Sequence, residues 1–116
     1  MKLSKFAQQL IGLGYEIFFN PTEETMRVEG QFDSTETEEI IRNIDNGKVS
    51  AWFISEVRLK YKSIESDSEY LGCCSYSEFD DFTGQDNDYF DDMLRTCLDN
   101  LENQLKELKA IELPKI

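Results

Sequence analysis

The chain of 116 residues contains no histidine. Histidine is the commonest general base and a frequent metal ligand, so its absence excludes every catalytic triad and zinc motif that needs an imidazole. Lysine and arginine number 12 against 24 aspartates and glutamates, which gives a formal net charge of −12. A domain that binds nucleic acid through its own surface needs the opposite excess. The sequence therefore predicts neither histidine chemistry nor direct contact with nucleic acid.

Phosphate-binding loops and membrane spans are also missing. Gly12-Leu13-Gly14 is followed by a predicted strand and not by a helix N-terminus, so it does not match a phosphate loop. No apolar run approaches the ~20 residues that cross a bilayer, and no small-residue cleavage pattern follows the N-terminal residues. Together with the missing histidine chemistry, these absences predict a cytoplasmic protein that is not an enzyme.

The three cysteines do not form a disulfide framework. Cys73 and Cys74 are adjacent, a spacing that closes a disulfide only with strain, and Cys97 stands alone at an apolar helix position. Reduced, packed thiols are the favoured interpretation over a redox pair. The carboxylates of residues 86–92 suit a hard cation but lack the glycine and glutamate positions of an EF-hand loop. We expect no cofactor and no metal, and a calcium-binding or metal-dependent protein is the third hypothesis.

The chain nevertheless has enough apolar material for a folded domain. Leucine, isoleucine, valine and phenylalanine together number 31, and there are 14 aromatic residues. Both counts exceed what a disordered acidic segment contains. A chain of this length buries roughly two thirds of its unfolded surface. Because no internal repeat or linker divides it, the sequence predicts one acidic domain over residues 1–116.

Apolar periodicity predicts the element order α-β-β-α-β-β-α. The expected elements are an amphipathic helix over residues 3–11, a hairpin of strands 15–19 and 26–32 joined by the turn-prone residues 20–24, a short helix from the caps Asp33, Ser34 and Thr35 to residue 46, a strand over 49–62, a strand over 69–76, a loop over 77–88 and a long helix from 88 to Pro114. Hairpin-linked strands favour an antiparallel sheet of about four strands with helices packed on one face, which is the α+β class.

The last predicted helix carries a stripe of leucines. Its members, separated alternately by four and three residues, are Leu94, Leu98, Leu101, Leu105 and Leu108. The favoured interpretation is a helix laid across the sheet, and the sharper one is a short coiled-coil seam that makes a homodimer. A regulatory or assembly protein that dimerises through this helix is therefore the alternative function.

Most of the net charge comes from one segment. Residues 65–92 hold ten acids and no base, whereas residues 1–64 carry a net charge of −2 and residues 93–116 carry none. Like charges placed so close together cost folding stability, and aromatic residues alternate with them. The candidate partner-binding residues are the acids Glu65, Asp67, Glu69, Glu78, Asp80, Asp81, Asp86, Asp88, Asp91 and Asp92 and the aromatic residues Tyr76, Phe79, Phe82 and Tyr89.

Two interpretations of this segment have equal weight. In the first, the acids are solvated turn residues, and some of them simply favour the N-terminus of the last helix, where the helix dipole attracts anions. In the second, the acids imitate nucleic-acid phosphates, because carboxylates accept bidentate contacts from arginine much as phosphates do. A protein of this kind would occupy a cationic cleft built for DNA. The expected partner is then a basic nucleic-acid-binding protein.

Two stretches, Glu78-Phe79-Asp80-Asp81-Phe82 and Asp88-Tyr89-Phe90-Asp91-Asp92, carry a resemblance to a known class. With its small size and its lack of catalytic residues, the chain resembles the phage-encoded inhibitors of bacterial defence, the anti-CRISPR and anti-restriction DNA mimics. The resemblance implies a stoichiometric inhibitor of a Cas effector nuclease, with Cas9 as the first candidate, or of a restriction enzyme. It also implies that the protein acts in the cytoplasm of an infected bacterium.

Overall fold

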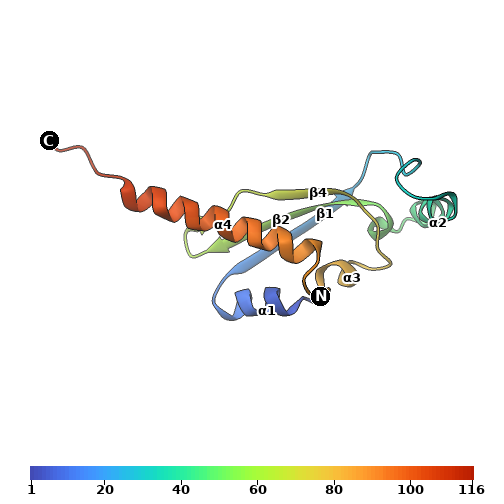
Figure 1. Cartoon of the computed structure of the whole chain (residues 1–116), viewed down its shortest axis with the longest axis horizontal. Coiled ribbons are helices and arrows are strands. Elements are labelled where there is room, and N and C mark those ends of the chain that lie inside the picture. Colours follow the sequence, from blue (N-terminus) through green and yellow to red (C-terminus); the bar gives the residue numbers. More distant parts are fainter.

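An open antiparallel sheet with helices against it forms the body of the protein, whose computed structural model describes all 116 residues (Figure 1). The elements, in chain order, are α1 (Lys5–Gly12), β1 (Glu16–Glu23), α2 (Ser34–Asp45), the 3-10 turn η1 (Val49–Ala51), β2 (Phe53–Tyr61), β3 (Ile64–Glu65), β4 (Glu69–Cys74), α3 (Phe79–Thr83) and α4 (Tyr89–Ala110). This architecture confirms the predicted α+β class, the four-stranded antiparallel sheet and the long C-terminal helix.

β2 is the central strand of the sheet. It pairs antiparallel with β1, from Glu16 opposite Lys60 to Glu23 opposite Phe53. On its other side it pairs with β4 and with the short β3. Successive side chains of a strand point to opposite faces, and the odd-numbered residues from 53 to 59 are buried while the even-numbered ones are partly exposed. β2 therefore separates an apolar core from a polar outer face.

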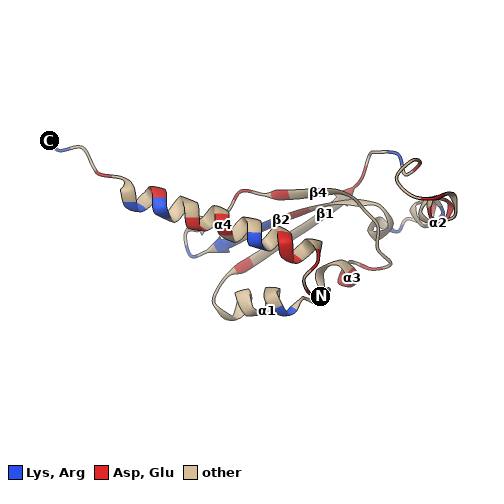
Figure 2. Cartoon of the chain, viewed as in Figure 1, with Lys and Arg blue, Asp and Glu red and all other residues tan.

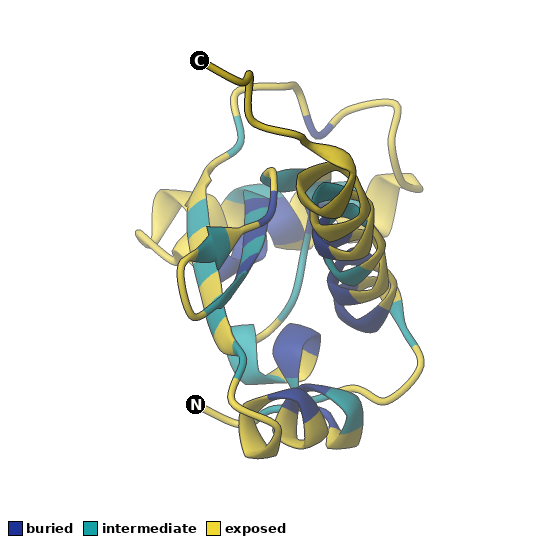
Figure 3. Ribbon diagram, turned by 90° about the vertical axis from the view of Figure 1, so that its left-hand side faces the viewer, coloured by how far each residue is buried: buried dark blue, intermediate teal, exposed yellow.

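Aromatic rings fill the core between the sheet and the helices. Phe53 of β2, Phe82 of α3 and Phe90 of α4 are almost completely buried. The ring of Phe19 on β1 lies 5.8 to 6.5 Å from these three rings, centroid to centroid. Aromatic pairs at such distances add to the stabilisation from buried area. Figure 3 shows the buried side of α4 turned toward the strands. The core therefore joins α3 and α4 to the inner face of the sheet.

α2 packs outside this core, at one end of the sheet. Its N-cap is Asp33, one of the three predicted caps, and the Asp33 carboxylate accepts a hydrogen bond of 2.9 Å from the Glu36 N–H. Ile40 of α2 lies against Val28 and Trp52 in a second, smaller apolar cluster. α2 is therefore held by a few side chains of its own and not by the main core.

The predicted hairpin between residues 15 and 32 is wrong. β1 continues through the turn-prone residues 20–23 and pairs with β2, while residues 26–32 form no strand and contribute only an isolated bridge. β2 offers nine extended residues, a longer partner than the segment after the turn. Pro21 is tolerated because β1 is an edge strand, with no neighbour on its outer side to need the missing N–H.

Two further predictions differ from the structure. Residues 77–88, predicted to be a loop, contain α3. Its five residues are too few for a periodic signal, although Phe79 and Phe82 both face the core. The strand predicted to begin at residue 49 begins at Phe53, because η1 comes first.

α4 is longer than the sheet that it covers. Leu94 and Leu101 are buried against the strands, whereas Leu105 and Leu108 are 41% and 53% exposed. The C-terminal half of α4 extends beyond the strands (Figure 1), and the longest dimension of the molecule is 66 Å. The first half of the leucine stripe therefore belongs to the core, and the second half is uncovered.

Replacing Leu94 by alanine should remove a completely buried side chain from the core. We expect the Leu94→Ala variant to lose about 2–5 kcal/mol of unfolding free energy, because both apolar contact and packing are lost. The matched control is Leu13→Ala, since Leu13 is 62% exposed, and it should change stability by no more than about 0.5 kcal/mol. Urea unfolding followed by circular dichroism measures both, and equal losses would contradict the described core.

Candidate partner-binding surface

The ten acids of residues 65–92 separate into two groups in the fold (Figure 2). Glu65 lies on β3, Glu69 lies on β4, and Asp67 lies on the connection between these strands. The other seven lie on α3, on the first turn of α4 and beside them: Glu78, Asp80, Asp81, Asp86, Asp88, Asp91 and Asp92. The fold therefore does not arrange the ten acids as one continuous belt.

Asp91 is an internal residue, only 1% exposed. Its carboxylate accepts hydrogen bonds from the Ser4 hydroxyl at 2.5 Å and from the Asn87 N–H at 2.7 Å. The same Ser4 oxygen accepts the Ala7 N–H at 3.1 Å and so caps α1. Asp91 therefore connects the start of α1 to the start of α4. A buried residue cannot contact a partner, so we leave Asp91 out of the candidate surface.

Two other acids also hold the N-terminal segment. Asp80 accepts the Lys2 N–H at 3.0 Å, and Asp86 accepts the Lys5 N–H at 2.8 Å. The Thr83 hydroxyl donates to the Lys2 carbonyl at 2.6 Å, and the Thr83 carbonyl accepts the Ser4 N–H at 2.8 Å. We call these bonds, together with the Ser4–Asp91 bond, the N-terminal clamp. The clamp fixes residues 2–5 to α3 and α4.

The fold brings basic residues to these acids from outside the acidic segment. Arg95, one turn further along α4, pairs with Asp92 at 3.2 Å and donates to the Asn87 side chain at 3.1 Å. Lys2 and Lys5 also lie beside the acids, because their main-chain N–H groups bond Asp80 and Asp86 in the N-terminal clamp. We define the acidic corner by its carboxylates Glu78, Asp80, Asp81, Asp86, Asp88 and Asp92, none of them buried. Three bases now accompany these six acids, so the corner is less negative than the sequence segment.

Of the aromatic candidates, Tyr89 is the only one that is mostly exposed. Tyr89 is 56% exposed, whereas Phe82 is buried and Phe79 packs against the core. The ring of Tyr76 lies 5.1 Å from that of Phe82. Burial, with Asp88 nearby, raises the pKa of the Tyr76 hydroxyl to about 12. Tyr89 is therefore, of the four, the aromatic side chain that offers most surface to a partner at the acidic corner.

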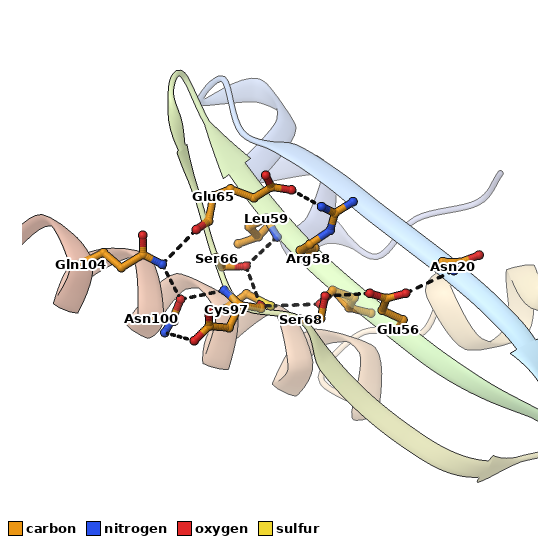
Figure 4. Close-up of polar contacts among 12 residues, drawn as sticks. Asn20, Glu56, Arg58, Leu59, Glu65, Ser66, Ser68, Cys97, Asn100 and Gln104 are labelled. Atoms are coloured by element: carbon orange, nitrogen blue, oxygen red, sulfur yellow. Dashed lines mark hydrogen bonds and ion pairs between the residues drawn. The ribbon is translucent and has the colours of Figure 1, made fainter.

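Two acids of the second group, Glu65 and Asp67, lie where α4 holds the β3–β4 turn (Figure 4). Glu65 forms an ion pair with Arg58 of β2, and its carbonyl accepts the Gln104 amide at 2.9 Å. Asp67 exchanges two hydrogen bonds with Asn100, its N–H donating at 2.9 Å and its carboxylate accepting at 3.2 Å. These contacts fasten the β3–β4 turn to the helix. Glu65 and Asp67 are thus committed within the protein, away from the acidic corner.

Glu24, which is not among the predicted site residues, holds the segment that follows β1. Glu24 accepts the Cys73 N–H at 2.8 Å through one oxygen and the Thr25 and Met26 N–H groups at 3.0 and 3.1 Å through the other. The bond from Cys73 is the main cause of a Glu24 pKa below its usual value. Cys73 has a φ of 55°, a left-handed conformation uncommon for residues other than glycine. Glu24 therefore stabilises an unfavourable backbone geometry, which no local sequence pattern indicates.

Two of the three cysteines, Cys74 and Cys97, have buried thiols. Burial raises the pKa of the Cys74 thiol to about 11 and raises that of Cys97 as well. Both thiols are therefore protonated at neutral pH, and the thiolate is the form that reacts or binds metal. No group of three or more acidic or thiol side chains is arranged to hold a metal ion.

Comparisons with protein-family models, with curated proteins and with solved structures found no match. The likeness to phage-encoded inhibitors therefore remains one of size and composition. No helix has both the length and the apolar character that crossing a bilayer requires. The surface feature that best fits a contact with another molecule is the acidic corner with the exposed ring of Tyr89 beside it.

Removing the Asp91 carboxylate should weaken the N-terminal clamp. We expect Asp91→Ala to cost about 1–3 kcal/mol of unfolding free energy, because two donors lose a buried acceptor. Asp92→Ala is the matched control: it removes an exposed pair with Arg95 at 3.2 Å, which should matter by less than about 1 kcal/mol. Urea unfolding at pH 7 compares them. A smaller loss for Asp91→Ala than for Asp92→Ala would show that the clamp does not stabilise the fold.

The role of Glu24 should appear as a pH dependence. Because its pKa is lower in the folded state, the carboxylate stabilises the fold above its unfolded pKa of about 4.3, and this contribution is lost as the pH falls through the folded value. The stability difference between the native chain and Glu24→Gln should therefore be constant from pH 7 to 5 and shrink toward pH 3. Glu23→Gln is the control, since Glu23 is not among the carboxylates that accept hydrogen bonds. A difference unchanged down to pH 3 would refute this role.

Proposed function

We propose that this protein is a stoichiometric inhibitor that binds the nucleic-acid cleft of a bacterial defence nuclease, of the Cas effector type, through the acidic corner. Carboxylates there would take the place of DNA phosphates on the partner's arginines and lysines. The observation that carries the proposal is the presence of six unburied carboxylates on fifteen residues, 78–92, against three neighbouring bases. The proposal places the protein in the cytoplasm of an infected bacterium and involves no cofactor.

The magnitude of the charge favours a local contact over imitation of a whole duplex. A net charge of −12 along a longest dimension of 66 Å gives about one charge per 5.5 Å. Duplex DNA carries about one per 1.7 Å, roughly three times more. Mimicry along the entire molecule would therefore be weak. The acidic corner concentrates the carboxylates in one place, so it is the part of the surface that competes best for a cationic cleft.

The charge of the protein is available to a partner because bases within the chain neutralise little of it. Only two ion pairs form, Arg58–Glu65 and Arg95–Asp92, although there are 24 acids. Opposite potentials across an interface raise the association rate and make binding sensitive to salt. A rapid encounter suits an inhibitor that must reach its target before the target reaches DNA.

The acidic corner is also fixed before binding. The N-terminal clamp holds Asp80 and Asp86 through bonds of 3.0 and 2.8 Å to backbone N–H groups, and Asp88 is held as the N-cap of α4. A surface that is already ordered loses less entropy on association. Beside these acids, the 56% exposed ring of Tyr89 offers the kind of aromatic anchor that often dominates binding energy.

Reversal of two carboxylates of the acidic corner should weaken inhibition strongly. Glu78→Lys/Asp81→Lys alters exposed residues that make no side-chain hydrogen bond, so the fold should be kept. The matched control, Glu38→Lys/Asp45→Lys, makes the same change of net charge on exposed residues of α2. DNA cleavage by guide-loaded Cas9 and by other guide-loaded Cas effectors, titrated with each protein, gives the inhibition constant. We expect the corner variant to inhibit at least tenfold more weakly and the control to stay within about threefold of the native chain.

Three results would contradict the proposal. The native chain could fail to inhibit any Cas effector, the corner variant could inhibit as well as the native chain, or the two variants could lose inhibition equally. Direct binding by calorimetry at ~0.1 M and ~0.5 M salt adds a second criterion, since an electrostatic contact weakens as salt screens it. An affinity that does not change with salt would likewise refute a contact made by carboxylates.

A further inference from the structure

The projecting half of α4 presents an apolar face to solvent. Leu105 is 41% exposed, Leu108 is 53% exposed, and Ile111 and Leu113 after the helix are 62% and 85% exposed. Where the helix leaves the sheet, a hollow of about 80 Å³ continues this face. Its apolar lining is Tyr15, Tyr61, Ile64, Leu98, Leu101 and Leu105. Large exposed apolar surfaces mark sites of contact with other molecules.

We propose that a second copy of this chain covers that face, with the two α4 helices antiparallel and Leu105 of each packed against Leu108 of the other. The 4-3 spacing of the leucine stripe is the pattern of a two-stranded coiled-coil seam. Its first half is used inside the protomer, because Leu94 is completely buried. Only the second half is free, so the inferred dimer contact is short and centred between Leu105 and Leu108.

Charge complementarity favours the second copy as the occupant. In this antiparallel arrangement, Glu102 of one helix lies opposite Lys109 of the other, and the symmetry of the dimer forms that pair twice. Both residues are exposed and both flank the leucine stripe. A parallel dimer would instead bring Gln104 opposite Lys109, with no opposite charge to meet it. The residues beside the seam therefore select the antiparallel orientation.

The distribution of net charge supports the same orientation. Residues 93–116 carry four acids and four bases, so their self-association meets no net repulsion. The remainder of the chain carries the whole net charge of −12. Antiparallel helices place the two acidic bodies at opposite ends of the dimer, whereas parallel helices would place them side by side, where they repel. The dimer also leaves both acidic corners free, because they lie at the other end of α4 (Figure 1).

The non-helical C-terminal tail can complete the contact. In the antiparallel arrangement, Ala110 of the second copy lies at the same height along the axis as Asn103 of the first, with both on the outer sides of the helices, so its tail starts at the level of the hollow. Ile111 and Leu113 of that tail are apolar and otherwise uncovered. A hollow of about 80 Å³ has room for one aliphatic side chain of this size. The exposed leucines, the hollow and the tail are thus covered by one contact.

Sedimentation equilibrium of the full chain from ~5 to ~300 µM tests the dimer. A contact this small predicts a dissociation constant in the micromolar range, about 1–100 µM. Leu105→Glu/Leu108→Glu should be monomeric throughout. Asn103→Glu/Ala110→Glu adds the same two charges to exposed positions away from the seam and should dimerise within about threefold of the native chain. Circular dichroism confirms that both variants fold. A native chain that is monomeric at ~300 µM, or a leucine variant that still dimerises, would overturn the proposal.

Charge swaps test the antiparallel arrangement. Glu102→Lys and Lys109→Glu should each weaken the dimer about three- to tenfold, because each creates two pairs of like charge. The combined swap should restore the native affinity, since opposite charges face each other again. Lys106→Glu is the control for net charge, because Lys106 is exposed and lies outside the seam. A combined swap that dimerises more weakly than either single variant would overturn the antiparallel pairing.

Discussion

Hydrogen bonds from backbone N–H groups to carboxylates are the interaction on which this structure depends most. Acids outnumber bases two to one, and only two ion pairs form, so bases cannot neutralise most carboxylates. A backbone N–H is an alternative donor, and an ionised acceptor makes the bond stronger. Asp33 and Asp88 accept such bonds as helix caps. Asp86 accepts the first N–H of α1, and Glu24 accepts that of Cys73. In this protein, hydrogen bonds from backbone N–H groups to carboxylates thus connect parts of the fold, a role that salt bridges have in chains of balanced charge.

The parts of the fold that sequence could predict are those specified by nearby residues. α1, α2 and α4 follow from apolar spacing and from caps such as Asp33, and the alternation of β2 is visible in its residues. The pairing of β1 could not be predicted in this way. Its turn-prone residues 20–23 suggest a hairpin with the next segment. Instead, β1 pairs with the longer β2, which begins thirty residues after β1 ends. α3 was missed because five residues show too little periodicity.

The candidate site was predicted only in part, because the sequence does not show which distant residues meet in the fold. A count along the chain finds the acids, but it does not find that Lys2 and Lys5 arrive from the other end of the sequence. Nor does it distinguish the buried Asp91 from the exposed Asp81. The spacing of Phe79 and Phe82 was a usable sign, since residues three apart share one face of a helix and both rings pack inward. The acids that remain as candidates are therefore fewer than the sequence segment suggests, and hydrogen bonds hold several of them in place.

The N-terminal clamp has a practical consequence for anyone who labels this molecule. Residues 2–5 are bonded to α3 and α4, yet Met1 itself is 74% exposed. An affinity tag, fluorophore or fusion partner attached before Met1 would therefore sit over Asp80 and its neighbours and shield them. A label after Ile116 would leave that region open but would crowd the projecting end of α4. The choice of terminus decides in advance which of the two surfaces an experiment can observe.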